Sequence, residues 1–244
     1  MLQAIVIRRD FRSLKSRTVI TLFPGVNVIV GDQGAGKSTL IELVRSIAAS
    51  DKMRHSRWRS IHIERAEAES ICLPMMSAPM RVIGYDFERD NVRMSPDFQF
   101  DDIERQIMGF RASHGQVSMS LLRDIADEAA RVKAGEPRML VMLDEPDSNL
   151  SPRSCYEVVR IMRALAAAGH QVIATAHNPI LITGEIPGDD TPGWKLLYDL
   201  ERNDFCKPAE YLAAQAMPAA KTATAAEPVK ATKVPVRAKV KAKR

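Results

Sequence analysis

The sequence has few cysteines and no long apolar runs, and these absences exclude several classes of protein. Its three cysteines, Cys72, Cys155 and Cys206, are odd in number and far apart, so they fit neither a disulfide framework nor a zinc cluster. The longest apolar runs near the motifs hold about five residues, whereas a membrane-spanning helix needs roughly 20. Residues 1–10 lack the small-residue cleavage site of a secretion signal. We therefore expect a cytoplasmic protein with no membrane span of its own.

Positive charge is concentrated near the C-terminal end. Residues 213–244 hold eight Lys or Arg and one Glu, a formal charge of +7, which leaves −2 of the overall +5 for residues 1–212. The segment consists mainly of Ala, Lys, Pro, Thr and Val without a helical or strand period, so we expect it to be disordered. Two interpretations stay open. It is a solubilising extension, or it binds nucleic-acid phosphates electrostatically, without aromatic residues to stack on bases.

Strand and helix patterns alternate through residues 1–212, although residues 51–80 give no clear pattern. The expected strands are Ala4–Ile7, Thr18–Leu22, Val26–Val30, Arg81–Tyr85, Met139–Leu143 and Gln171–Thr175. The expected helices are Lys37–Ala49, Asp101–Phe110, Gln116–Lys133 and one that follows Ser151 and ends at Gly169. The helix at 116–133 should pack through one face, made of Val117, Leu121, Ile125, Ala129 and Val132. The alternation predicts an α/β fold with a mostly parallel sheet, and such sheets bind ligands at the carboxyl ends of their strands.

A glycine-rich loop between an expected strand and an expected helix carries the strongest motif. The residues Gly31, Asp32, Gln33, Gly34, Ala35, Gly36, Lys37 and Ser38 match the pattern G-x-x-x-x-G-K-[ST]. Glycines let the backbone N–H groups of such a loop wrap around phosphates, and the following helix presents its positive end to them. We expect Lys37 to reach the β- and γ-phosphates and Ser38 to ligate Mg²⁺, with Thr39 completing the nucleotide-binding set.

Two adjacent acids end the apolar run Met139–Leu143. Asp144 can hold Mg²⁺, and Glu145 can orient and deprotonate an attacking water molecule. Together with the glycine-rich loop, the pair predicts a site for Mg-ATP.

Four further segments carry a resemblance to a known family over roughly residues 1–200. They are Leu143-Asp144-Glu145-Pro146, Ser148-Asn149-Leu150-Ser151, Thr175-Ala176-His177 and Ser113-His114-Gly115-Gln116. They resemble, in order and spacing, the Walker B, D-loop, switch-histidine and signature segments of ABC-class ATPases. The similarity is greatest to small stand-alone ATPases of the SMC, RecF and OLD-type branch, whose members also carry an early stretch like Phe11-Arg12-Ser13.

The resemblance implies a mechanism in which two chains sandwich two ATP molecules. The signature residues Ser113, Gly115 and Gln116 of one chain would then lie at the γ-phosphate bound by the other. His177 would contact the γ-phosphate in its own chain, and Glu145 would act as the general base. Lys37 would complete the catalytic set.

The sequence departs from the family pattern at several positions. His114 replaces the first glycine of the signature and Ser151 replaces the usual D-loop aspartate, which puts communication between chains in doubt. No clear Q-loop glutamine is present, and the candidates for that place are Asp86, Glu88 and Gln99. Phe11 is a candidate for stacking on adenine, although a core position explains it as well. Sustained heptads are absent between Lys37 and Ser113, so an SMC-type coiled-coil arm is not expected.

The sequence therefore predicts an ABC-type P-loop domain with N-terminal antiparallel strands. The domain should span residues 1–212, with a helical insertion at about 50–133, and residues 213–244 should form a tail. The predicted function is that of a Mg-dependent ATPase that dimerises on binding ATP, with a role in DNA maintenance, repair or defence as one setting. A nucleotide-binding subunit of an ABC transporter and a nucleotide-gated scaffold with little turnover are the alternatives.

Overall fold

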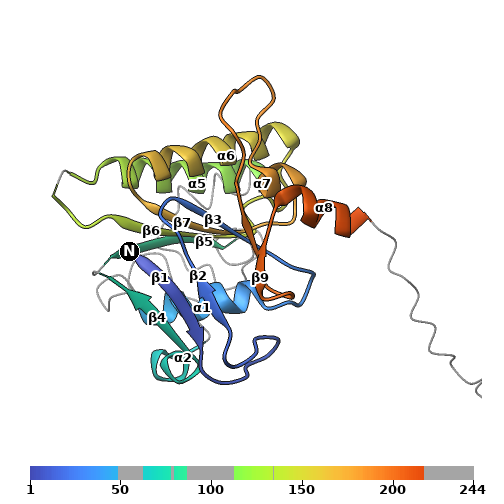
Figure 1. The fold of residues 1–244 in the computed structure, drawn as a ribbon. Coiled ribbons are helices and arrows are strands. Elements are labelled where there is room, and N and C mark those ends of the chain that lie inside the picture. Colours follow the sequence, from blue (N-terminus) through green and yellow to red (C-terminus); the bar gives the residue numbers. More distant parts are fainter. Residues whose placement is uncertain (49–62, 78–79, 87–112, 134, 217–244) are drawn as a thin grey trace, which may run out of the picture.

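A computed structural model describes residues 1–48, 63–77, 80–86, 113–133 and 135–216. Within them the chain is an α/β fold built on two sheets (Figure 1). The larger sheet has six strands in the order β5-β6-β7-β3-β8-β9. Their bounds are β5 Arg81–Asp86, β6 Met139–Asp144, β7 Gln171–Thr175, β3 Val26–Val30, β8 Leu197–Asp199 and β9 Asp204–Cys206. The strands from β5 to β8 run parallel, and β9 runs antiparallel to β8.

A smaller antiparallel sheet is formed near the N-terminus. It has three strands in the order β2-β1-β4, with β1 at Leu2–Ile7, β2 at Val19–Thr21 and β4 at Cys72–Met76. Its inner face packs with helices α1 (Lys37–Ala48) and α2 (Arg65–Ile71) below the larger sheet, as Figure 1 shows. The predicted N-terminal antiparallel strands are confirmed.

The opposite face of the larger sheet is covered by helices α5 (His114–Ala130) and α6 (Pro152–Ala167) (Figure 1). The alternation of side chains along β6 accounts for this sandwich. Val141 and Leu143 face the helices α5 and α6, whereas Leu140 and Met142 face α1 and the smaller sheet. Because both faces are covered, the strand is apolar at every position before its terminal acid, as expected of a central parallel strand.

The connections that follow the parallel strands place the predicted motifs at one edge of the sheet. The chain passes from β3 to α1 through the glycine-rich loop and from β6 to α6 through residues 145–151. It passes from β7 to the short helix α7 (Pro179–Thr183) through residues 176–178. The last helix, α8, spans Pro208–Ala216.

Several sequence predictions differ from the structure in extent. The interval expected as a helical insertion includes the strands β4 and β5, and β5 belongs to the larger sheet. Helix α5 buries Leu122 more fully than Leu121, and Val132 lies beyond its end, although Leu121 and Val132 also pack against the core. Helix α8 continues to Ala216, so the boundary expected at 212 falls inside a helix. The helix expected at Asp101–Phe110 and residues 217–244 of the tail lie outside the described residues.

Candidate nucleotide-binding site

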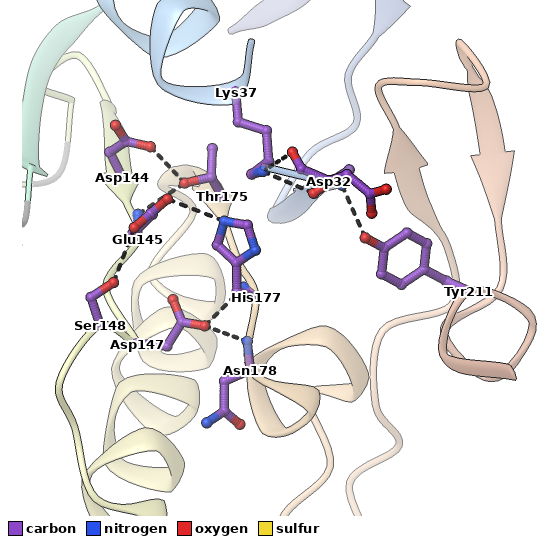
Figure 2. A network of polar contacts seen from close by, with 11 residues as sticks. Asp32, Lys37, Asp144, Glu145, Asp147, Ser148, Thr175, His177, Asn178 and Tyr211 are labelled. Carbon is purple, nitrogen blue, oxygen red and sulfur yellow. Dashed lines mark hydrogen bonds and ion pairs between the residues drawn. The ribbon is translucent and has the colours of Figure 1, made fainter. Parts of the chain in front are cut away.

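The phosphate loop is closed around the ammonium group of Lys37. Nζ of Lys37 donates to the carbonyl oxygens of Gly31 at 2.8 Å and Asp32 at 2.9 Å (Figure 2). The side chain is buried, and burial lowers the pKa of Lys37 against the opposing effect of nearby carboxylates, Glu145 first. A glycine is needed at position 36, where φ is +100° and a Cβ atom would lie 3.0 Å from the Leu14 side chain.

A loop from the N-terminal sheet supports the phosphate loop from outside. Arg12 donates from Nη1 to Thr39 Oγ1 at 3.2 Å, and the Ser13 hydroxyl donates to the Gly34 carbonyl. Phe11 is half-buried against the core below the larger sheet, and the Arg12 guanidinium lies 5.2 Å from its ring centre. The Phe-Arg-Ser stretch thus contacts the loop and the core, while stacking of Phe11 on adenine stays a prediction.

Asp144 ends β6 next to the start of α1. Its register partner is Asp86 at the end of β5, and Thr175 Oγ1 donates to Asp144 Oδ1 at 2.6 Å. Burial raises the pKa of Asp144 to about 6, the Asp86 charge acts in the same direction, and hydrogen bonds from Thr175 and Ser38 oppose the rise. A buried carboxyl beside a serine hydroxyl is an oxygen-only donor set of the kind that Mg²⁺ prefers.

No group of three His, Cys, Asp or Glu side chains within the described ranges is arranged to hold a metal ion. A magnesium ion at Asp144 and Ser38 would depend on phosphate oxygens and water for its other ligands, which is how Mg²⁺ is held in many nucleotide sites. The residues present fit that arrangement. Of the Q-loop candidates, Asp86 pairs with the buried Arg45 of α1 at 3.5 Å, and Glu88 and Gln99 lie outside the described residues.

Glu145 lies at the centre of a network that Figure 2 shows. Its Oε1 lies 3.1 Å from Nε2 of His177, and its Oε2 accepts from the Ser148 hydroxyl at 3.1 Å. Its backbone N–H donates to Thr175 Oγ1 at 2.9 Å, and its backbone adopts a left-handed φ of +47°. The hydrogen bond from His177, more than any other contact, lowers the pKa of Glu145, which keeps the side chain ionised.

Two residues of this region were not among the predicted site residues. Asp147 is buried, and its Oδ2 accepts from the backbone N–H groups of His177 at 2.9 Å and Asn178 at 2.5 Å. Tyr211 of α8 accepts a hydrogen bond from the Gly31 N–H at 3.2 Å. The only available signal for Asp147 is its place two residues after Glu145, and no motif points to Tyr211.

The predicted signature residues cap a helix. Ser113 and Gln116 bond each other's backbone N–H groups at the start of α5. A Cβ atom on Gly115 would lie 3.0 Å from the Asn149 carbonyl, so this segment packs against the D-loop of its own chain. Ser151 caps α6, where its hydroxyl accepts from the Ser154 N–H at 3.3 Å. A contact of Ser113, Gly115 or Gln116 with nucleotide stays a prediction.

Comparisons with known proteins agree with the motifs. A family profile described as an AAA domain matches residues 8–125. The ABC multidrug transporter I of Aspergillus fumigatus is 28% identical over an alignment of 183 residues that covers 64% of this chain and 12% of the transporter. The ABC transporter G family member 18 of Arabidopsis thaliana is 25% identical over 72% of this chain and 29% of its own length. The chain resembles an ABC-class P-loop ATPase.

This chain therefore spans about an eighth of the fungal transporter's length. Among solved structures, the SMC head domain from Thermotoga maritima is 15% identical, over 81% of this chain and 94% of that one, with a TM-score of 0.44. A nucleotide-free ATP-binding cassette from an ABC transporter is 11% identical, over 88% and 96%, also with a TM-score of 0.44. No helix in the described part of the chain has the length and apolar content to cross a membrane.

Proposed function

We propose that this chain binds Mg-ATP and hydrolyses it at the carboxyl edge of the larger sheet. The observation that carries the proposal is that Lys37, Asp144, Glu145 and His177 come from three separate connections and lie together at this edge, where the two carboxylates act on the charge of Lys37 (Figure 2). Each side chain has the chemistry that phosphoryl transfer to water requires. Such reactions depend on positioning and charge stabilisation more than on covalent catalysis.

The phosphate end of the nucleotide would bind at the loop Gly31–Ser38. The loop's backbone N–H groups and the start of α1 provide an anion site, and the ammonium of Lys37 is already oriented by two loop carbonyls. Mg²⁺ held by Ser38 and Asp144 would neutralise charge that develops on the phosphates. Gln33, Ala35 and Thr39 belong to the same loop and helix start.

Glu145 is the proposed general base. An ionised carboxylate is required for proton abstraction, and the lowered pKa of Glu145 provides one at neutral pH. His177 and Ser148 each hold one carboxylate oxygen, so they fix the orientation of the base. Each of the two oxygens keeps a second lone pair, so the carboxylate can accept a proton from water while both contacts stay in place.

The test is Glu145→Gln, with Glu157→Gln as a matched control on α6, where Glu157 pairs with Arg123 of α5. Glu145→Gln should bind Mg-ATP with an affinity close to that of the parent and lose at least about 100-fold in turnover, because the amide cannot accept the proton. Glu157→Gln should behave as the parent. Parent-like turnover of Glu145→Gln would remove Glu145 from the mechanism.

Dimerisation driven by ATP belongs to the same proposal. It is supported by the resemblance of residues 113–116 to the family's signature segment, which contacts the γ-phosphate bound by a second chain. The Glu145→Gln variant should therefore accumulate as an ATP-bound dimer, which light scattering with and without Mg-ATP would detect. A monomer under saturating Mg-ATP would refute the sandwich.

A nucleotide-binding subunit of a transporter is the second candidate, favoured by the curated relatives. Native protein that sediments with membranes would support it, and recovery in the supernatant would support the stand-alone ATPase. A nucleotide-gated scaffold would bind Mg-ATP but turn over far below the usual enzymatic range of about 1–1000 s⁻¹. Binding of nucleic acid by residues 213–244 would support a role in DNA maintenance, repair or defence.

A further inference from the structure

Helix α8 docks on the rest of the chain through Tyr211 and Leu212 and through side-chain hydrogen bonds. Tyr211 is its one buried residue and is 6% exposed, whereas Leu212 is partly buried against the core. In Figure 1 the helix lies beside the carboxyl edge of the larger sheet, after β9. Figure 2 shows the Tyr211 ring extending from this side toward the phosphate loop.

The hydrogen bonds that α8 makes with the phosphate loop involve the first two residues of that loop. The Gly31 N–H donates to the Tyr211 hydroxyl at 3.2 Å, and Gln215 Nε2 donates to Asp32 Oδ1 at 2.9 Å. Gln215 also lies 3.4 Å from the Tyr211 hydroxyl. These bonds join residues that are about 180 positions apart in the sequence, since the Gly31–Tyr211 separation is 180 and the Asp32–Gln215 separation is 183.

The same two loop residues are held from their other side by Lys37. The carbonyls of Gly31 and Asp32 accept from the ammonium of Lys37, while the N–H of Gly31 and the carboxylate of Asp32 are bonded to α8. Gly31 has a φ of +148°, a conformation that side-chain-bearing residues rarely adopt and that a flexible glycine would readily leave. The hydrogen bond that the Gly31 N–H donates to Tyr211 therefore restrains the backbone at the start of the loop.

We propose that Tyr211 is a positioning residue of the nucleotide site, through which the docked helix α8 sets the affinity for Mg-ATP. The inference rests on the proposed function. A loop that is already in its binding conformation loses less conformational entropy when the ligand arrives, so its affinity is higher. Burial raises the pKa of Tyr211, so the hydroxyl stays protonated and neutral through the pH range of an assay.

The test compares Tyr211→Phe with Tyr198→Phe in the full chain. Each change removes one hydroxyl and keeps the ring, and the Tyr198 hydroxyl bonds Asn203 in the turn between β8 and β9 rather than the phosphate loop. Titration calorimetry with Mg-ATP and steady-state turnover are measured on both. Tyr211→Phe should raise Kd and KM by about 2- to 10-fold, the range expected for one hydrogen bond, and leave kcat within about twofold. Tyr198→Phe should leave both unchanged.

A double-variant cycle with Gln215→Ala gives an independent readout. Because Gln215 contacts both Asp32 and Tyr211, its loss should also weaken Mg-ATP binding, and the effects of the two changes should be less than additive. The inference fails if Tyr211→Phe keeps the parent Kd, lowers kcat instead, or weakens binding no more than Tyr198→Phe. If the parent protein binds no Mg-ATP, the proposed function fails as well. If the parent binds Mg-ATP and Tyr211→Phe has no effect on binding, only this inference fails.

Discussion

The hydrogen bonds of Asp147 allow a test of how far activity at the proposed site depends on the position of His177. Its carboxylate accepts two backbone N–H groups, from His177 and Asn178, and so links the turn after β6 to the turn after β7. The other oxygen, Oδ1, is buried without a hydrogen-bond partner. Burial raises the pKa of Asp147, which means that the two backbone bonds do not fully compensate the loss of water around the charge.

The magnitude of the Asp147→Ala effect follows from these opposing contributions. Hydrogen bonds to a charged group contribute about 1.5–3 kcal/mol each, but removing the carboxylate also removes its own burial cost. We therefore expect a net loss of about 1–3 kcal/mol in the free energy of unfolding. Turnover should fall by about 10- to 100-fold, because the freed turn lets His177 and with it Glu145 move by a fraction of an ångström to an ångström.

Urea denaturation and steady-state ATPase kinetics measure the two effects separately. Asp147→Asn retains an oxygen that can face both N–H groups, so it should recover most of the stability and part of kcat, with KM close to the parent in both variants. Asp189→Ala is the control, because Asp189 also bonds a backbone N–H, that of Thr191, and pairs with Arg163 of α6 instead of contacting His177. Parent-like kcat in Asp147→Ala would refute the positioning of His177 by Asp147.

Two more predictions concern stability and the tail. His170 accepts from the Met139 N–H and its other nitrogen lies 3.2 Å from the Ala129 carbonyl, and burial lowers its pKa from 6.5. His170 therefore binds a proton more readily in the unfolded chain than in the folded protein, so the free energy of unfolding decreases as the pH falls below about 6.5. In urea denaturation, His170→Gln should make the free energy of unfolding depend less on pH in this range. The same pH dependence in the variant and the parent would contradict this role of His170. Deleting residues 217–244 removes a formal charge of +7 and leaves helix α8 complete. The shortened protein should therefore be retained less strongly on DNA at low salt and should keep its ATP turnover. Unchanged retention on DNA would show that the tail does not bind nucleic acid.

Much of the larger sheet could be predicted because its strands are short apolar runs next to strong turn signals. Val26–Val30 and Gln171–Thr175 were predicted with the bounds that the structure has. The strand β4 was missed because it contains Pro74 and methionines, which sequence patterns do not associate with strands. Proline is tolerated there because β4 is an edge strand of the smaller sheet. The strands β8 and β9 have three residues each, too few to show a period.

Some residues of the candidate site belong to local sequence motifs, whereas others are brought there by contacts between distant parts of the chain. Lys37, Asp144 and Glu145 were predictable because each motif specifies a local backbone shape whose chemistry is known. The bonds of Asp147 and Tyr211 join residues that are 30 and 180 positions apart, and they form only when the tertiary fold brings two connections together. A single sequence has no periodic or compositional signal for such contacts, so they required the structure.

The opposite pKa shifts of Asp144 and Glu145 explain how two neighbouring carboxylates can take different roles. Asp144 is enclosed at the end of β6 beside Asp86, and its raised pKa of about 6 corresponds to a cost on the order of 3 kcal/mol for ionising it in the folded protein. A nearby cation would remove that cost, which favours Asp144 as a metal ligand. Glu145 is half-exposed and its charge is stabilised by His177, so it needs no cation to stay ionised and is free to act on water. When the surroundings shift the pKa values of two neighbouring carboxyl groups in opposite directions, one group can serve as a metal ligand and the other as a base.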